Sequence, residues 1–102
     1  MIAVRLVFRA KFGHAQDVLA LFKAGAQMAR AAGGGARHVR ILTDLSGPFD
    51  TVVQELEFES IEQYMRSQAA LFTDPRWQQM MRQSAEFIES GAKEYYTIEI
   101  DE

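Results

Sequence analysis

His38 is the side chain of this sequence best suited to acid–base chemistry, because histidine is the residue that gains or loses a proton near neutral pH. The alternation along its segment places His38 and Arg40 on the same side of a strand, and the register expected for the following hairpin aligns His38 with Glu57. A histidine beside a carboxylate can act as a catalyst or simply as the partner in an ion pair. The ion pair is the commoner arrangement, and both interpretations stay open.

Arg5, Arg9 and Arg40 indicate a second kind of chemistry, the binding of an anion such as a carboxylate or an enolate. A guanidinium group offers its donors in a planar fork that matches two oxygen atoms at once. If the protein is an enzyme, we therefore expect His38 as acid or base and Arg40 or Arg5 as the group that stabilises negative charge. The favoured alternative is internal pairing of these arginines with acidic side chains of neighbouring strands, which are Glu55, Glu57 and Glu99.

Large aromatic and methionine side chains are concentrated between residues 64 and 87. Most side chains of this kind at helical spacing belong to a core. The pair Asp74-Pro75 interrupts the helical pattern, however, and leaves room between helix and sheet for a cleft with aromatic walls, which is the kind of site that binds small apolar molecules. The residues expected to contact such a ligand are Trp77, Tyr64, Glu57 and Tyr95.

Several other chemistries lack the residues that they need. The chain has no cysteine, which excludes disulfides, thiolate catalysis and thiolate metal sites. It has no glycine-rich phosphate loop and no nucleophilic-serine motif, and one histidine near two carboxylates is too weak a pattern to predict a metal. We therefore predict neither a metal nor a cofactor.

Charge and hydropathy limit the partners. The 11 basic and 14 acidic side chains are well mixed and give a formal net charge of −3, which argues against nucleic-acid binding. No apolar run approaches the length that spans a membrane, and the first residues alternate like a strand instead of forming a signal peptide. We expect a cytoplasmic protein with no nucleic-acid or membrane partner.

The spacing of apolar residues predicts elements in the order β-α-β-β-α-β. Ser60 with Gln63 forms a capping box at the start of the second helical region, and Asp74 followed by Pro75 restarts that helix after a kink. The predicted elements are a strand over 2–9, a helix over 15–32, strands over 37–43 and 51–58, a helical region from about 60 to 90, and a strand over 94–100.

This order predicts one domain over residues 1–102, with an α+β, ferredoxin-like fold. Right-handed crossovers give an antiparallel sheet of strand order 4-1-3-2, with both helices on one face. The opposite face would carry arginines alternating with glutamates, together with exposed apolar side chains, namely Val7, Leu42, Val53 and Tyr95. Such a face favours pairing with the sheet of a second copy, since a small domain alone buries only a modest share of its surface.

The chain resembles the dimeric α/β-barrel superfamily, and within it the NIPSNAP-like and antibiotic-biosynthesis-monooxygenase-like groups. The resemblance covers essentially the whole chain and is loose, because it depends on element order and short motifs. The segments that carry it are Ala3–Phe8, Phe12–Ala15, Asp74–Gln78, Glu89–Gly91 and Glu94–Thr97.

The resemblance implies a homodimer whose two sheets close into a barrel, with a ligand cavity in the lumen or between each sheet and its helices. Members of the superfamily include cofactor-free oxygenases, haem-degrading proteins, and isomerases or cyclases of small aromatic compounds. The haem-degrading members use an asparagine, a tryptophan and a histidine; Trp77 matches the tryptophan, but the chain has no asparagine. Haem degradation is therefore disfavoured, and the quinone-forming oxygenases are weakened by the same absence.

We therefore expect a homodimeric small-molecule-binding protein that pairs through its sheet face. Its activity is not assigned by the sequence; if it is an enzyme, we expect a cofactor-free one of the oxygenase, isomerase or cyclase type, acting on an aromatic or polyketide-like compound. The alternative is a non-catalytic, stress-response-type dimerisation or binding module, whose charged face serves only to specify pairing.

Overall fold

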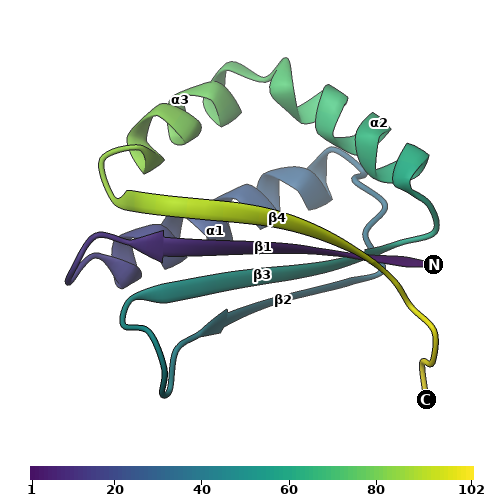
Figure 1. Cartoon of the computed structure of the whole chain (residues 1–102). Coiled ribbons are helices and arrows are strands. Elements are labelled where there is room, and N and C mark those ends of the chain that lie inside the picture. Colours follow the sequence, from purple (N-terminus) through teal and green to yellow (C-terminus); the bar gives the residue numbers. More distant parts are fainter.

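The computed structural model describes residues 1–102 and confirms the predicted fold class. Four antiparallel strands form one sheet in the order β2-β3-β1-β4, which is the predicted 4-1-3-2 order read from the other edge. All helices lie on one face of this sheet (Figure 1). The elements are β1 (Ile2–Ala10), α1 (Ala15–Ala31), β2 (His38–Thr43), β3 (Thr51–Phe58), α2 (Ile61–Phe72), α3 (Pro75–Ser84) and β4 (Ile88–Thr97).

The breaks in the helical layer follow from local side-chain chemistry. Ser60 caps α2, because its side chain accepts a hydrogen bond from the backbone N–H of Gln63 at 3.1 Å. The Gln63 side chain in turn accepts from the N–H of Glu59 at 2.9 Å, one residue before the position that a capping box would use. Asp74 caps α3, with Pro75 at its first position, as the sequence predicts.

The prediction of the last strand over 94–100 is wrong in two ways. Its bounds differ by several residues from those of β4, and its register is shifted by one residue. β4 covers Ile88–Thr97, and its Tyr95 lies opposite Val4 of β1. Directly opposed residues of an antiparallel pair point to the same face, so Tyr95 faces the helices, where its ring centroid lies 5.9 Å from that of Tyr64. Ile98, which the apolar alternation placed inside the last strand, comes after the end of β4. A shift of one residue in the register of a strand moves every side chain to the other face of the sheet.

A close contact between β1 and β4 accounts for this register. The Phe8 ring covers Gly91, where an added Cβ would come within 2.5 Å of the ring. Gly91 lies opposite Phe8 in the ladder, and a bulge between Arg9 and Ala10 shifts the pairing at the end of β1. The glycine therefore fixes which residue of β4 faces the ring.

The apolar core is small and divided into two parts. One cluster joins Val4, Leu56, Phe58 and Tyr64 near the start of β1, and the other joins Ala10, Val18 and Val52 near its end. Only 12 of the 102 residues are buried, which is little for a chain of this length.

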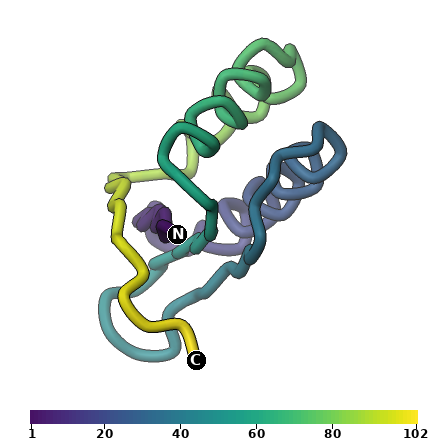
Figure 2. The backbone as a smooth tube through the Cα atoms, turned by 90° about the vertical axis from the view of Figure 1, so that its right-hand side faces the viewer, coloured from purple at the N-terminus to yellow at the C-terminus, as the bar shows by residue number.

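No helix covers the other face of the sheet, which lies between two projections; Val53 on this face is nevertheless buried at 7% exposure, contrary to its predicted exposure. The loop 44–50 and the segment after Thr97 both extend away from the helical side (Figures 1 and 2). Exposed apolar side chains occur on both projections: Leu45, Phe49 and Ile100. We call this sheet surface the open face.

Candidate functional site

The two core clusters are separated by a row of residues that points from the sheet toward the helices. Across β2, β3, β1 and β4, the paired positions of this row are Ile41, Gln54, Leu6 and Lys93. Gln54 is half-buried, and it interrupts strand positions that are otherwise apolar on the helix side. Gln54 is unusual there, because it is a polar side chain in a layer that should exclude water, whereas Lys93 on the edge strand β4 is exposed. We call these four residues the middle row.

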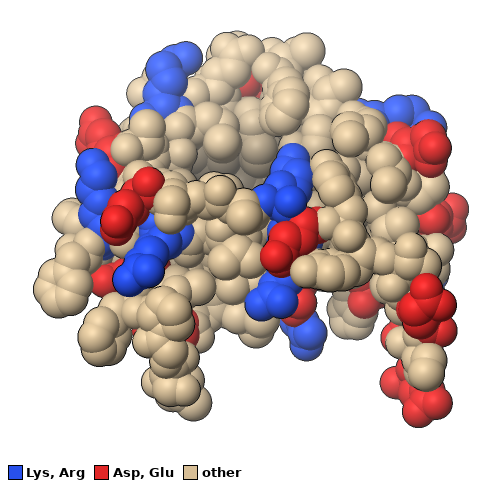
Figure 3. All heavy atoms as spheres, in the orientation of Figure 1, with Lys and Arg blue, Asp and Glu red and all other residues tan.

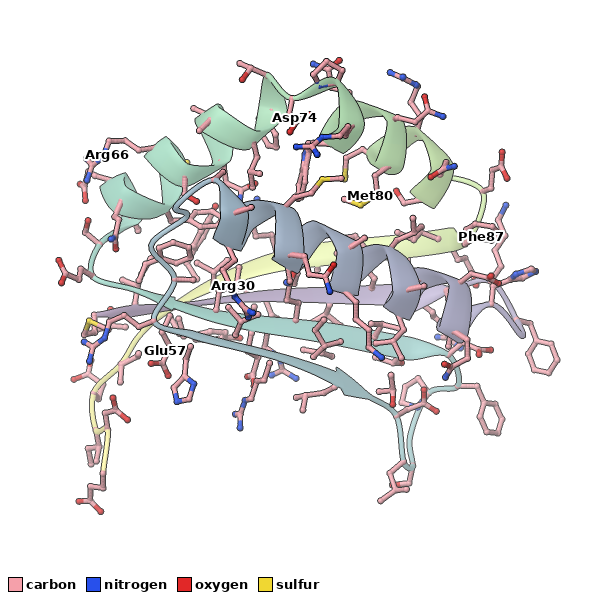
Figure 4. All side chains as sticks on the ribbon, turned by 180° about the vertical axis from the view of Figure 1, so that it is seen from behind. Arg30, Glu57, Arg66, Asp74, Met80 and Phe87 are labelled. Atoms are coloured by element: carbon pink, nitrogen blue, oxygen red, sulfur yellow. The ribbon has the colours of Figure 1, made fainter.

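The helices approach one another closely on the helical side of the sheet. An added Cβ on Gly25 of α1 would lie 3.0 Å from Met80 Cε and 3.2 Å from Trp77 Cζ3, both from α3. Figure 4 shows Met80 directed from α3 toward α1. The indole Nε1 of Trp77 is buried and has no hydrogen-bond acceptor. Its acceptor lies outside the chain and is either a water molecule or a ligand.

Lys93 lies beneath α2 at the β4 edge of the middle row. Its Nζ is 5.1 Å from the centroid of the Tyr64 ring, and no carboxylate lies within ion-pair distance of it. The Tyr64 ring also meets Phe58 and Tyr95 edge to face, at centroid distances of 5.1 Å and 5.9 Å. Lys93 is exposed, so its ammonium group is hydrated at the outer edge of these rings, whereas Phe58 and Tyr64 are buried.

The surface is hollowed on this side of the molecule. Figure 3 shows a recess between the helical layer and β4, with mostly uncharged walls and Lys or Arg atoms at its border. A separate groove of about 430 Å³ lies between α1 and α3, with apolar walls that include Leu21, Met28 and Met80.

The residues predicted from sequence to form the site lie on two different faces. Tyr64, Trp77 and Tyr95 are on the helical side of the sheet. On the open face, by their pairing, are Arg5, His38, Arg40 and Glu57; Figure 4 shows Glu57 on the side of the sheet away from the helices. Within one chain, the proposed acid–base and anion-binding groups are thus separated by the sheet from the aromatic wall.

The open face carries a row of alternating charges. Arg40, Glu55, Arg5 and Glu94 follow one another across the four strands. Arg40 Nε lies 2.7 Å from Glu55 Oε1, whereas Arg5 Nε lies 3.9 Å from Glu94 Oε1 and is buried without a hydrogen-bond partner. The acid beside Arg5 is therefore Glu94, and the predicted partner Glu99 lies beyond β4.

The hairpin register is as predicted, but His38 makes no ion pair. His38 lies opposite Glu57, and Arg40 lies opposite Glu55. His14 instead bonds Asp17, with 2.9 Å between its Nδ1 and the carboxylate. A catalytic role for His38 stays a prediction.

Sequence reasoning missed Gln54 and Lys93. Gln54 was visible as the polar exception among the helix-facing positions of its strand. Lys93 fell outside the predicted last strand, so its side was not assigned. No group of three or more His, Asp or Glu side chains is arranged to hold a metal ion, and no helix is long and apolar enough to cross a membrane.

Comparisons with known proteins agree with this architecture. Residues 5–98 match the NIPSNAP family model. A protein from Agrobacterium tumefaciens has a solved structure with a TM-score of 0.83 and 21% identity, over 95% of this chain and 92% of that one. An uncharacterised NIPSNAP domain protein from Burkholderia xenovorans gives a TM-score of 0.80 and 18% identity, over 96% and 94% of the two chains.

A third solved structure extends the fold beyond this group. An antibiotic biosynthesis monooxygenase-like protein from Nitrosomonas europaea gives a TM-score of 0.77 at 10% identity, over 98% of this chain and 100% of that one. At such identity the likeness concerns the fold alone. No curated protein matches the sequence.

Proposed function

This protein belongs to the NIPSNAP family, and we propose that it binds a small aromatic or polyketide-like molecule between its sheet and its helices. The interruption of the core carries this proposal. Gln54 and Lys93 face the helices on either side of Leu6, between two clusters that do not join. A layer that served only for stability would place an apolar side chain at the half-buried position of Gln54, whereas Lys93 is exposed at the edge of the sheet.

The site favours binding and polarising an oxygen atom of the ligand. The buried indole N–H of Trp77 is a donor, the amide of Gln54 can donate as well, and the exposed ammonium of Lys93 lies at the border of the site. Stabilising negative charge on an enolate or a phenolate is the chemistry that cofactor-free oxygenases, isomerases and cyclases need. If the protein is an enzyme, we expect this chemistry at Lys93.

The roles proposed for His38, Arg40 and Arg5 belong to the open face and need a separate test. With a second copy on that face, the three side chains would line the space between two sheets. Replacing His38 by Ala should then lower turnover of a substrate, once one is identified, without weakening its binding beside Trp77. Unchanged turnover would remove the assignment of His38 as acid or base.

The binding proposal is tested by filling the middle row. Leu6→Phe adds volume where the core is interrupted, so we expect it to raise the free energy of unfolding by about 1 kcal/mol. Val4→Leu is the matched control, because Val4 is fully buried in the first cluster and added volume there should cost about 1–3 kcal/mol. Both changes are measured by urea unfolding.

Binding is measured with 2-naphthamide through the fluorescence of Trp77, the only tryptophan of the chain. We expect saturable quenching that Leu6→Phe weakens about tenfold. If Leu6→Phe destabilises the protein as Val4→Leu does, and the quenching is absent or unchanged, the site does not exist. That outcome would favour the alternative of a non-catalytic module that only pairs.

We also propose that the protein is a homodimer joined through the open face. The alternating row of Arg40, Glu55, Arg5 and Glu94 supports this, because a copy related by a two-fold axis can set its glutamates against the arginines. The unpartnered Nε of Arg5 and the small core point the same way.

A further inference from the structure

Charged and apolar side chains lie in separate rows that cross the open face. The charged row contains, in sheet order from β2 to β4, Arg40, Glu55, Arg5 and Glu94. The apolar row next to it contains, in the same order, Leu42, Val53, Val7 and Ala92. A second copy that covers the open face must match both rows at once.

Every sign in the charged row is inverted when the row is read backwards. From β2 to β4 the charges are positive, negative, positive and negative, so from β4 to β2 they begin with a negative charge. A copy that lies on the charged row with its strand order reversed therefore sets an opposite charge against each of the four positions. A copy with the same strand order would set like charges against one another, which is strongly unfavourable.

The two-fold axis of a dimer decides which of these arrangements occurs. Sheets that pack face to face in the aligned manner keep their strands within about 30° of each other, so an axis between them runs either nearly along the strands or nearly across them. An axis along the strands reverses the strand order and places each row on its own copy. An axis across the strands keeps the strand order and exchanges the rows, so it opposes like charges or buries the charged row against the apolar row.

The charged row keeps free bonding capacity within the single chain. Arg5 Nε is buried without a hydrogen-bond partner and lies 3.9 Å from Glu94 Oε1, which is too far for a hydrogen bond. Glu55 uses only its Oε1, at 2.7 Å from Arg40 Nε. The side chains of Arg5 and Glu55 are 43% and 28% exposed, so a copy on the open face can reach both.

We infer that the two-fold axis of the proposed dimer runs along the strands. At the centre of the charged row, Arg5 then pairs with the partner's Glu55. At the ends of the row, Arg40 pairs with the partner's Glu94. Every charge in the row then has one opposite charge in its own chain and one in the partner, and the two apolar rows meet beside them. The inference rests on the proposed dimer and specifies its geometry.

The test exchanges the charges of the central pair between two variants. Arg5→Glu opposes two carboxylates in its own homodimer, and Glu55→Arg opposes two guanidinium groups, whereas every pair is again of opposite sign in a mixed dimer of the two variants. Glu57→Arg mixed with Arg5→Glu is the matched control, because Glu57 lies opposite Ala3, outside the charged row. Native mass spectrometry distinguishes the mixed dimer from each homodimer, and circular dichroism checks that each variant is folded.

We expect Arg5→Glu and Glu55→Arg each to raise the dissociation constant of the homodimer by about 100-fold. Their equimolar mixture should form a mixed dimer, whereas the control mixture should not. Single variants that stay dimeric, or a mixture that associates no better than the control, overturn the inferred axis while a wild-type dimer still stands. A monomeric wild-type protein overturns the proposed dimer itself.

The outer pair of the charged row gives a second test if a central variant does not fold. Arg40→Glu and Glu94→Arg lie on the edge strands β2 and β4, where a change of charge disturbs the chain less. The same axis predicts that each dissociates alone and that the two recover a mixed dimer. Absence of that recovery overturns the inferred axis in the same way.

Discussion

At the scale of single residues, Asp74 couples the break in the helical layer to pH. The pKa of its carboxyl is lowered, first by the hydrogen bond from the Arg76 side chain and then by the bond from the Arg76 backbone N–H. A carboxyl whose pKa is lower in the folded state contributes stability that is complete above its unfolded value of 3.8 and is lost as pH falls through the folded value. The start of α3 should therefore weaken in acid.

We expect Asp74→Ala to lower the melting temperature at neutral pH and to matter less at an acidic pH below the lowered pKa of the wild-type carboxyl, where that carboxyl is protonated. Asp74→Asn is the control, since it keeps a capping oxygen without the charge and should lie between the two proteins at neutral pH. Melting curves at both pH values give the comparison. A loss in Asp74→Ala that is the same at both pH values would show that the charge contributes nothing.

Gly91 is the residue on which the register of β4 depends. Because a Cβ there would overlap the Phe8 ring at 2.5 Å, Gly91→Ala should cost about 1–3 kcal/mol in the free energy of unfolding. Phe8→Leu removes the ring, so the double variant should lose less than the sum of the two single changes. Strict additivity in urea unfolding would mean that the ring does not hold the register.

At the scale of elements, the sequence predicted what short-range chemistry decides. The alternation in β1, the hairpin register that aligns Arg40 with Glu55, and the caps at Ser60 and Asp74 all depend on residues near one another in the chain, and all are confirmed. β4 was misplaced, because its side depends on the long-range contact between Phe8 and Gly91. The side chain of Lys93 was not assigned to a face for the same reason, since it also belongs to β4. Tyr64 and Trp77, in contrast, were recognised from their helical spacing.

The cap of α2 provides the element-scale prediction. Ser60→Ala removes the acceptor for the N–H of Gln63 and should cost about 1 kcal/mol, which lowers the melting temperature by about 4–8 °C. Ser67→Ala, within the same helix, is the control and should change little. Equal effects of the two substitutions would show that the cap does not stabilise α2.

At the scale of the whole molecule, the two faces of the sheet carry different features. The helical side holds a divided core with donors facing it, and the open face holds paired charges between two projections (Figure 2). A ligand on one side and a second copy on the other would each cover surface that the chain alone leaves incomplete. Sequence reasoning found both sets of residues but placed them in one site, although its own assignment of faces already put His38 and Arg40 on the side of the sheet opposite Tyr64 and Trp77.

The dimer proposal predicts that a substitution on the open face changes the oligomeric state, whereas a substitution on the helical layer does not. Leu42 lies in an apolar row of the open face with Val53 and Val7, and it is 40% exposed in the single chain. Leu42→Glu would bury a carboxylate without a partner between two sheets, so we expect it to convert a dimer into a monomer at micromolar concentration. Met81→Glu changes an equally accessible side chain of α3, 48% exposed, and should stay dimeric. Sedimentation equilibrium distinguishes the two masses: a monomeric wild-type protein overturns the proposal, and a dimer disrupted by Met81→Glu but not by Leu42→Glu would move the contact to the helical layer.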